Sequence, residues 1–320
     1  MTNFDAKNEV VQDQSVQQEL ENPVMRQEWE GRLNPKAARM VQAPDPERVA
    51  MIISDHTIRY PAFDQVVNQA EWMINEPRQT RARGLVVCAQ RNNGKSSLAA
   101  TIHKMYNQYD RPDLPTAIKV DMTGVRDARS LYGRIMDEMG SPARISHRLS
   151  DRELIVQRLL RDVDCRLLIL DEAQDILLGS EREQQRALEG LKLLMNKLGL
   201  PILAFGTEKA GTGFNGDPHL AARFKEYVLP TWGKNHALAS FLATYERLLP
   251  LKNASNLASE ENLTLLAKLG NGLLGKIVER IQNAALAAIV DGSERITKEH
   301  LTKASSRPET CLLSRGAEAK

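Results

Sequence analysis

The feature that most constrains the fold of this chain is the stretch GLVVCAQRNNGKSS, residues 84–97. An apolar run leads into a polar loop, the loop closes with Gly94-Lys95-Ser96, and a helical pattern follows. A buried parallel strand, an anion-binding turn and a helix in this order form a P-loop, because loop amides and the helix N-terminus together attract phosphate. The stretch therefore predicts a nucleotide-binding α/β fold. A glycine-containing turn that opens a helix is the alternative for these residues alone.

P-loop chemistry gives individual residues a role. Lys95 reaches the β- and γ-phosphates of ATP, and the Ser96 hydroxyl ligates Mg²⁺. Ala89 replaces the first glycine of the motif, which requires that its backbone is not left-handed, since only glycine adopts positive φ at little cost. Nucleotide contacts are expected from six consecutive residues: Asn92, Asn93, Gly94, Lys95, Ser96 and Ser97.

A second stretch, RLLILDE at residues 166–172, supports the same interpretation. Consecutive apolar residues that end in two carboxylates are typical of a strand buried on both faces of a parallel sheet. Asp171 comes at the carboxyl end of that strand, the edge where ligands bind in open α/β sheets. There Asp171 can hold the hydration shell of Mg²⁺, and Glu172 can polarise the attacking water. An acidic N-cap on the next helix is the alternative. The two motifs together predict an ATPase.

The amino-acid composition says more about the cellular compartment of this protein than about its binding partners. The 320 residues include 43 Lys and Arg against 41 Asp and Glu, and this near-balance neither requires nor excludes nucleic acid. Cys88, Cys165 and Cys311 have no metal-binding or disulfide spacing, and the first two are expected to pack in the core. No apolar run approaches a membrane span, and the N-terminus lacks a signal-peptide core. A cytoplasmic protein without membrane contact is therefore expected.

Strands and helices alternate through the middle of the chain, which predicts a doubly wound parallel sheet sandwiched by helices. Pro61 and Pro77 bound one predicted helix, and a short helix is expected around 47–54. Besides the two motif strands, further strands are expected at 116–122, 201–206 and 227–229. Helices are expected up to residue 140 and at 151–162, 181–198, 239–249, 260–269, 273–290 and 298–303.

Four segments follow from this pattern. Residues 1–35 are polar and acidic and are expected to form a mobile tail, in which Val24 and Trp29 are the apolar residues able to dock on the body or on a partner. Residues 36–235 form the nucleotide-binding α/β domain with an N-terminal helical extension. Residues 236–304 form a small all-helical lid, and 305–320 a loose C-terminal tail.

The chain resembles an AAA+ ATPase in the order of its motifs. The P-loop (Walker A) is followed by the Asp-Glu pair (Walker B), a polar residue after the next strand, an arginine beyond it and a helical lid. The resemblance implies that Thr207 is sensor 1, whose hydroxyl orients the lytic water or the γ-phosphate, although a helix cap is the alternative for a threonine here. It also implies that Arg223 is an arginine finger acting in trans on the neighbouring subunit, although a solvated surface arginine is the alternative. Lys276 falls near the sensor-2 position, where the wider family usually has arginine.

Within AAA+, the chain resembles the TniB/TnsC transposition regulators over roughly residues 40–305. The resemblance is carried by RYPAF at 59–63, NNGKS at 92–96, DEAQ at 171–174 and FGTEKA at 205–210. It places Tyr60 among the nucleotide-binding residues. Ala89 for glycine and Arg91 in the loop depart from the family pattern. The resemblance implies ATP-dependent assembly on double-stranded DNA as a ring or helical filament, target-site selection, and contacts with a transposase and a TniQ-type targeting protein.

Two basic groups are candidate DNA contacts. Proteins that this chain resembles track a DNA backbone with the region that here carries Lys119, Thr123, Arg126 and Arg129. A second group contains Arg144, His147, Arg148 and Arg152. Neither group is interleaved with aromatic residues, and a solvated charged face is the alternative for both. No separate acidic triad suited to two-metal strand transfer stands out.

Three functions remain open on sequence alone. The first is a transposition regulator whose ATPase cycle controls assembly. The second is another AAA+ DNA machine, such as a helicase loader or a replication initiator. The third is a nucleotide-gated binding platform that hardly hydrolyses ATP, which would follow if Thr207 and Arg223 were mispositioned.

Overall fold

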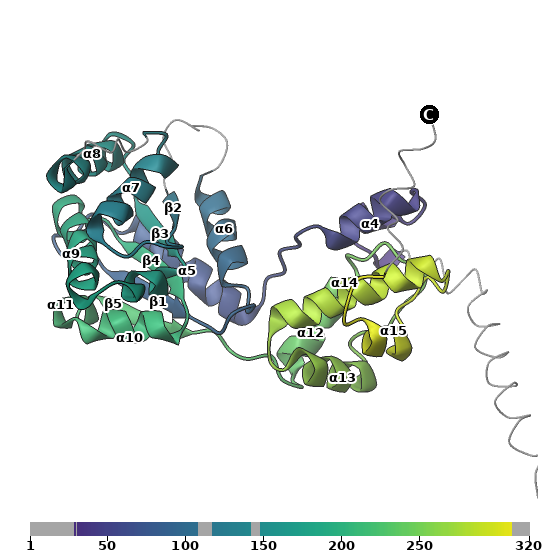
Figure 1. The fold of residues 1–320 in the computed structure, drawn as a ribbon. Coiled ribbons are helices and arrows are strands. Elements are labelled where there is room, and N and C mark those ends of the chain that lie inside the picture. Colours follow the sequence, from purple (N-terminus) through teal and green to yellow (C-terminus); the bar gives the residue numbers. More distant parts are fainter. Residues whose placement is uncertain (1–28, 30, 108–116, 142–147, 309–320) are drawn as a thin grey trace, which may run out of the picture. The chain divides into compact units, whose positions relative to one another are not determined.

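The computed structural model describes residues 29, 31–107, 117–141 and 148–308, which fall into two units (Figure 1). An α/β unit spans Arg59–Thr231, and a helical unit combines the chain up to Ile58 with the chain from Trp232 onward. Arg144, His147, Cys311 and most of both expected tails lie outside the described residues. Within the described part of the chain, none of the helices combines the length and the apolarity that a membrane crossing requires.

The α/β unit is built on a five-stranded parallel sheet in the order β2-β3-β4-β1-β5. Its strands are β1 Gly84–Cys88, β2 Ala117–Asp121, β3 Leu167–Asp171, β4 Ile202–Gly206 and β5 Phe224–Val228. Every residue of β1, β3 and β4 is buried, as expected for the continuous apolar runs of a covered parallel sheet. The predicted parallel α/β sheet is thereby confirmed.

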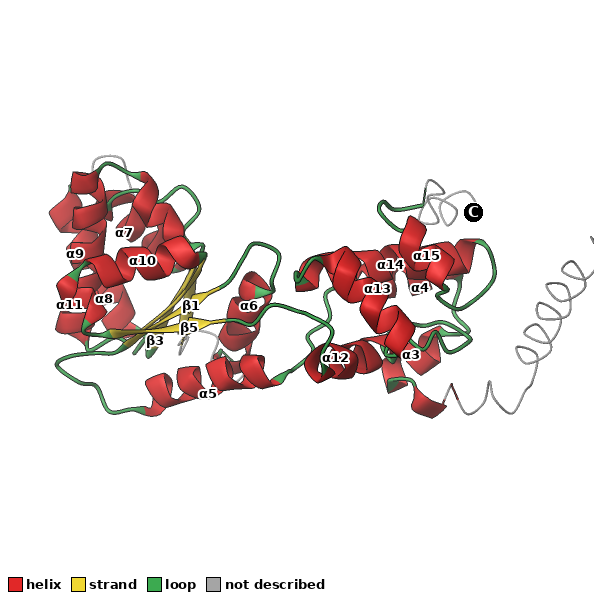
Figure 2. Ribbon diagram, turned by 90° about the horizontal axis from the view of Figure 1, so that it is seen from below, coloured by secondary structure: helices red, strands yellow, loops and turns green. Residues whose placement is uncertain are grey.

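Helices cover both faces of this sheet (Figure 2). On one face, α5 and α6 pack over the odd-numbered side chains of β1 and β3, such as Leu85 and Ile169. On the other face, α7, α8, α9 and α10 pack over the even-numbered side chains, such as Val86 and Leu168. The helices of this unit are α5 Pro61–Asn75, α6 Lys95–Tyr106, α7 Ala128–Glu138, α8 Leu149–Asp162, α9 Glu181–Leu198, α10 Glu208–Gly216 and α11 Pro218–Ala221, with a 3-10 helix, η1, over Ala173–Leu178.

Several elements differ from the sequence expectation. The helix at Pro35–Met40, α11 and η1 were not expected, and the helix at His236–Glu246 lies three residues before its expected place. Strand β5 begins at Phe224, three residues before the expected start, because its exposed Lys225 and Glu226 hide the apolar signal of an edge strand. Helix α10 was not expected, since the glycines at 211 and 213 lower its helix propensity. Cys88 and Cys165 are buried in the core, as expected.

The helical unit contains α3 Pro35–Met40, α4 Asp45–Ile53, α12 His236–Glu246, α13 Glu260–Gly270, α14 Leu274–Val290 and α15 Lys298–Lys303. The N-terminal segment is part of its core. Leu33, Ala37 and Met51 form one apolar cluster, and the Trp29 ring packs against it. Trp29 Nε1 also donates a hydrogen bond to the Leu251 carbonyl at 3.1 Å, so this residue docks on the body of the protein.

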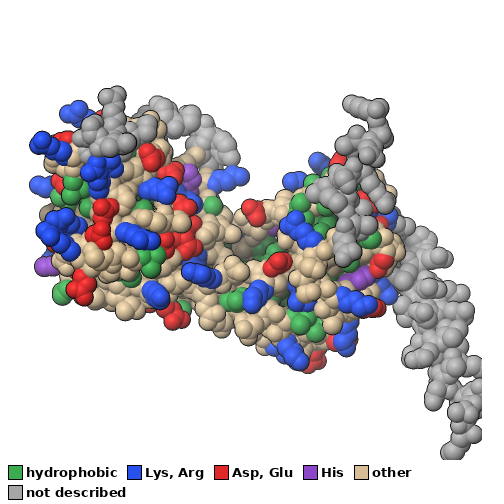
Figure 3. Space-filling model, in the orientation of Figure 1, with side chains coloured by type: hydrophobic (Ala, Val, Ile, Leu, Met, Phe, Trp, Pro, Cys, Tyr) green, Lys and Arg blue, Asp and Glu red, His purple; other side chains and the backbone are tan. Residues whose placement is uncertain are grey.

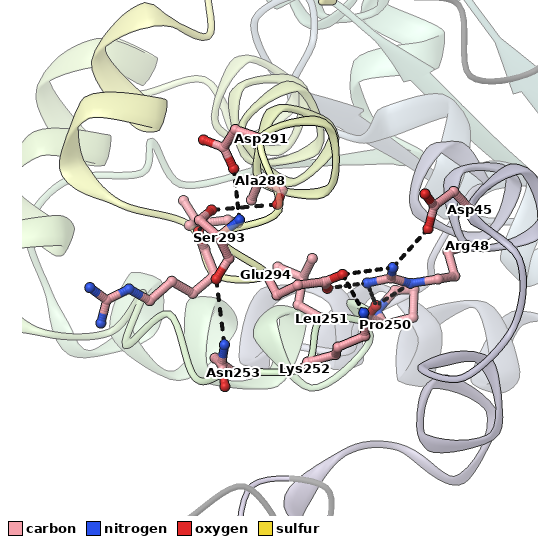
Figure 4. A network of polar contacts seen from close by, with 12 residues as sticks. Asp45, Arg48, Pro250, Leu251, Lys252, Asn253, Ala288, Asp291, Ser293 and Glu294 are labelled. Carbon is pink, nitrogen blue, oxygen red and sulfur yellow. Dashed lines mark hydrogen bonds and ion pairs between the residues drawn. The ribbon is translucent and has the colours of Figure 1, made fainter. Parts of the chain in front are cut away.

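A buried ionic network fixes α4 to the segments that follow α12 and α14 (Figure 4). The Arg48 side chain, 1% exposed, donates to the Pro250 carbonyl at 2.9 and 3.1 Å and to both carboxylate oxygens of Glu294. Lys252 Nζ adds a third donor to Glu294 at 2.7 Å. Residues 36–58 therefore belong to the helical unit, whereas they were predicted to be an extension of the α/β domain.

Candidate nucleotide-binding site

The loop between β1 and α6 has the backbone of an anion-binding turn. Asn92 and Gly94 both have positive φ, 59° and 81°, and Gly94 caps the N-terminus of α6. Ala89 is not among the residues with positive φ, which explains why alanine is accepted where the motif has glycine. Asn93 is 2% exposed and its Nδ2 donates to the Pro230 carbonyl at 3.2 Å, tying the loop to the segment after β5.

Lys95 closes the loop from inside. It is 4% exposed, and its Nζ donates to the carbonyls of Ala89 and Gln90 at 3.1 and 2.9 Å. Burial lowers the pKa of Lys95, while the carboxylates of Glu172 and Asp171 act in the opposite direction. The Lys95 ammonium group, held at the N-terminus of α6, is therefore well placed to bind phosphate oxygens.

The two sequence motifs meet at Asp171. Ser96 Oγ donates to Asp171 Oδ1 at 3.2 Å, which joins the start of α6 to the end of β3. On the other carboxylate oxygen, Lys119 Nζ of β2 lies 3.8 Å away. Burial raises the pKa of Asp171, and the Ser96 hydrogen bond and the Lys119 charge oppose that rise. Lys119 was expected to contact DNA; the structure places its ammonium group near this carboxylate, and its contact with DNA stays a prediction.

Glu172 has a left-handed backbone, with φ of 52°, which is uncommon for a residue other than glycine. Its N–H donates to Asp171 Oδ1 at 3.1 Å, and its carboxylate accepts a hydrogen bond from Gln174 Nε2. Left-handed non-glycine residues cost free energy and cluster at functional sites. Here the left-handed conformation turns the chain between β3 and η1. Asp171 is the last residue of the strand, and Glu172 is the turning residue that follows it.

Thr207 follows β4, whose last residue pairs with Cys88 at the start of the P-loop. It occupies the N-cap position of α10, but its side chain makes no capping hydrogen bond. Its Oγ1 is buried and has no hydrogen-bond partner among the described residues. Such a buried, unpaired hydroxyl is costly unless a further group pairs with it. The capping alternative therefore does not account for this side chain.

Arg223 lies away from the P-loop of its own chain. It precedes β5, which runs parallel to β1 in the register Gly84–Phe224 to Cys88–Val228. A five-residue strand is about 16 Å long at ~3.3 Å per residue, so Arg223 and the P-loop lie at opposite edges of the sheet. Its Nη1 donates to Asn196 Oδ1 on α9 at 2.6 Å, so this arginine is not simply solvated.

The remaining predicted nucleotide-binding residues are Tyr60, Asn92, Ser97 and Lys276. The Tyr60 ring packs edge-on against Phe63, with centroids 5.8 Å apart, and burial raises the pKa of Tyr60 to about 12. Asn92 lies on the P-loop and Ser97 in the first turn of α6, and both are exposed. Lys276 is exposed on α14 of the helical unit, and its sensor-2 role stays a prediction.

The donor set fits the phosphates of a nucleotide and Mg²⁺. The left-handed turn at Asn92 and Gly94, the helix N-terminus and the Lys95 ammonium suit phosphate. The Ser96 hydroxyl and the Asp171 carboxylate supply the oxygen ligands that Mg²⁺ prefers.

This strand order is that of the AAA+ fold, which solved structures share with this chain. The model of the family described as bacterial TniB protein matches residues 48–234, and the chain belongs to the TniB family. No curated protein matches the sequence significantly.

Several solved structures share the fold. The Aeropyrum pernix ORC2 protein in ADPNP–ADP complexes is 15% identical, with a TM-score of 0.59, covering 78% of this chain and 70% of that one. ORC1 of the same organism, in complex with DNA, is 14% identical, with a TM-score of 0.62, covering 80% and 68%. The Walker-type ATPase PABY2304 of Pyrococcus abyssi is 14% identical, with a TM-score of 0.53, covering 79% and 74%.

Two residues with a positioning contact were not predicted from the sequence, Gln174 at this site and Asn196 beside Arg223. Gln174 appeared only as the last letter of the DEAQ stretch, yet it contacts both Glu172 and Thr207. Asn196, the partner of Arg223, carries no sequence signal, because it is one polar residue on the exposed side of α9.

Proposed function

We propose that this protein binds and hydrolyses ATP with Mg²⁺ at the P-loop. The observation that carries the proposal is the 3.2 Å hydrogen bond from Ser96 to Asp171, because it joins the phosphate-binding loop to the acidic strand end. The nucleotides named for the ORC2 structure of the same fold give further support.

Each side chain then has a defined task. Lys95 turns from the loop carbonyls to the β- and γ-phosphates, and Glu172 polarises the attacking water. The unpaired Thr207 hydroxyl orients that water or the γ-phosphate. When bound, Mg²⁺ neutralises charge on the phosphates, with Ser96 and Asp171 as the residues that hold it.

The test is a comparison of Glu172→Gln with the parent protein in ATP binding and turnover. Glu172→Gln keeps the shape of the side chain, so ATP affinity should be retained while turnover falls by about 10²–10⁴-fold, the contribution of a general base. A fall of less than about tenfold would remove Glu172 from this role. Lys95→Ala is the matched control, because it should lose ATP binding itself.

The cellular task that best fits membership of the TniB family is the regulation of DNA transposition. In this proposal the protein assembles on double-stranded DNA with ATP, marks the target site, and links a TniQ-type targeting protein to the transposase. Arg223, at the sheet edge opposite the P-loop, would complete the site of the next subunit. That head-to-tail contact is heterologous, so its repetition gives a ring or an open helix.

The loop after β2 and the first turn of α7 are the proposed DNA contact, through Thr123 and Arg126 of the loop and Arg129 of the helix. Thr123 and Arg126 are exposed, and Asp121 holds the loop by accepting hydrogen bonds from the Thr123 N–H and hydroxyl at 2.9 and 2.6 Å. On the face of the α/β unit seen in Figure 3, Lys and Arg side chains interleave with Asp and Glu. A few defined contacts to phosphates therefore suit this protein better than a uniformly basic surface.

A replication initiator or helicase loader is the second candidate, favoured by the likeness in fold to the ORC and Cdc6 structures. The two candidates differ in their partner. Retention of a TniQ-type protein or a transposase on DNA that carries this ATPase supports the first candidate, and retention of a replicative helicase supports the second.

A further inference from the structure

Gln174 occupies a buried position between the two halves of the proposed hydrolytic site. It lies in η1, three residues after the end of β3, and is 8% exposed. Its Nε2 donates to Glu172 Oε2, and its Oε1 accepts a hydrogen bond from the Thr207 N–H at 3.0 Å. One side chain thus contacts both the water-polarising carboxylate and the sensor-1 residue.

The orientation of this amide is determined by its neighbours. A backbone N–H such as that of Thr207 can only donate, so it must face the amide oxygen. The NH₂ group then faces Glu172, whose ionised carboxylate can only accept. The same NH₂ group lies 3.3 Å from Asp175 Oδ1, a second acceptor. The amide therefore cannot flip without opposing like groups at both ends.

The backbone around Gln174 is shaped for this contact. A Cβ on Gly206 would lie 2.8 Å from Gln174 Oε1, so glycine at the end of β4 permits the close approach. The left-handed backbone of Glu172 brings its carboxylate back over η1 toward the amide. A buried amide with its donor and acceptor both used is rigid, and such groups orient the side chains they touch.

We propose that Gln174 is a positioning residue that holds the Glu172 carboxylate in its water-polarising orientation and makes that orientation depend on the backbone at Thr207. A displacement of Thr207 on contact with the γ-phosphate then reaches Glu172 through a single side chain. The inference rests on the proposed ATPase function and adds the residue that couples its sensor to its base.

Steady-state ATP turnover of the parent protein, Gln174→Ala and Gln174→Glu tests this role. Gln174→Ala should lower kcat by about 10- to 100-fold, the range seen when a residue that orients a functional ligand is removed. KM for ATP should stay within about twofold, because the amide acts on the hydrolytic step and not on binding. Gln174→Glu keeps the size and the acceptor for Thr207 but sets a second carboxylate against Glu172, so its kcat should fall at least as far.

Gln184→Ala is the matched control. Gln184 Nε2 holds the other end of η1 by donating to the carbonyls of Leu177 and Gly179 at 2.9 and 2.7 Å, and no hydrogen bond joins it to Glu172. If Gln174 only supported the turn, both substitutions to alanine would lower kcat and Tm to a similar extent. We expect Gln184→Ala to keep the parental kcat, whatever its effect on Tm.

Glu172→Gln in the same assay separates the possible failures. Suppose that the parent hydrolyses ATP, Glu172→Gln does not, and Gln174→Ala has the parental kcat. This result would overturn the role of Gln174 without affecting the proposed ATPase function. Equal, negligible turnover by the parent and Glu172→Gln would overturn both. If Gln174→Ala fails to fold, the isosteric variant Gln174→Glu is the test. A parental kcat of Gln174→Glu would then contradict the proposal.

Discussion

The ammonium group of Lys119 lies 3.8 Å from the carboxylate of Asp171, the residue expected to hold Mg²⁺. The two side chains come from neighbouring parallel strands, in which Lys119 pairs with Ile169 and Asp121 with Asp171. Strand β2 therefore runs beside β3 up to its last residue. Lys119, which was predicted to contact DNA, lies beside the proposed nucleotide site.

From this contact we predict that Lys119→Ala lowers the Mg²⁺ concentration needed for half-maximal ATP turnover. Unit charges about 4 Å apart interact by ~1 kcal/mol or more, so removing the competing cation should shift the midpoint by about fivefold. A Mg²⁺ titration of turnover measures the shift, and Lys104→Ala, an exposed lysine on α6, is the control. An unchanged midpoint with a DNA-binding salt slope reduced by about 0.9 would instead make Lys119 a phosphate contact.

Arg223→Ala should bind ATP normally and hydrolyse it poorly. An arginine finger is worth about 10³-fold or more in kcat, and Arg223 is too far from its own P-loop to act there. Mixing Arg223→Ala with Lys95→Ala subunits should restore part of the turnover, because some interfaces then join an intact P-loop to an intact finger. Co-assembly without recovery would show that Arg223 does not act in trans.

Asn196→Ala is the control for that experiment. It removes the partner that holds Arg223 at 2.6 Å but leaves the guanidinium free to reach a neighbouring subunit. Its turnover should therefore stay near that of the parent. A loss as large as in Arg223→Ala would mean that the arginine serves the fold of its own chain.

Asp175 connects the nucleotide site to the loop after β2. Its Oδ2 accepts a hydrogen bond from the Gly124 N–H at 2.9 Å, while its Oδ1 faces Gln174. We predict that Asp175→Ala reduces the factor by which duplex DNA changes ATP turnover, because the loop loses its tie to η1. Turnover with and without DNA measures that factor, and Asp137→Ala, which changes an exposed residue of α7, is the control. An unchanged factor would show that the two regions are not coupled through this carboxylate.

Arg48→Ala should destabilise the helical unit by about 3–5 kcal/mol, the cost of leaving a buried partner unpaired. Burial alone would raise the pKa of Glu294, but the hydrogen bonds from Arg48 and Lys252 outweigh it and lower the pKa below 4.5. A lowered folded-state pKa contributes stability above pH 4.5 that disappears as the pH falls through the folded-state value.

Chemical denaturation between pH 7 and pH 3 checks both statements. The parent should lose more stability across the acid range than Glu294→Gln, which cannot titrate there. Lys298→Ala, which breaks an exposed pair with Glu261, should follow the parent. Equal pH dependence of the parent and Glu294→Gln would contradict the role of this network.

The central strands and the P-loop could be predicted because their signals are local. Strands β1, β3 and β4 are continuous apolar runs that are buried on both faces. The edge strand β5 has only β1 as a neighbour, so its apolar signal is weaker and its start was misplaced. Helix boundaries such as those of α9 and α15 follow from periodicity and capping residues, and were predicted to the residue.

Long-range pairings could not be predicted in the same way. Arg48 and Glu294 are ordinary surface residue types in the sequence, and only tertiary packing buries them together. The same holds for Lys119 beside Asp171 and for Gln174 between Glu172 and Thr207. A single sequence identifies the groups that carry the chemistry more readily than the groups that position them.

The most direct test of an ATP-controlled assembly on DNA is the affinity of the protein for duplex DNA with a non-hydrolysable ATP analogue, with ADP and without nucleotide. Fluorescence anisotropy at several salt concentrations measures it, and electron microscopy of the same samples shows the assembly. We expect tighter binding with the analogue by about 5- to 150-fold, the range of typical allosteric coupling, and regular oligomers around the DNA. Equal affinity in all three states would contradict an ATP-controlled assembly on DNA.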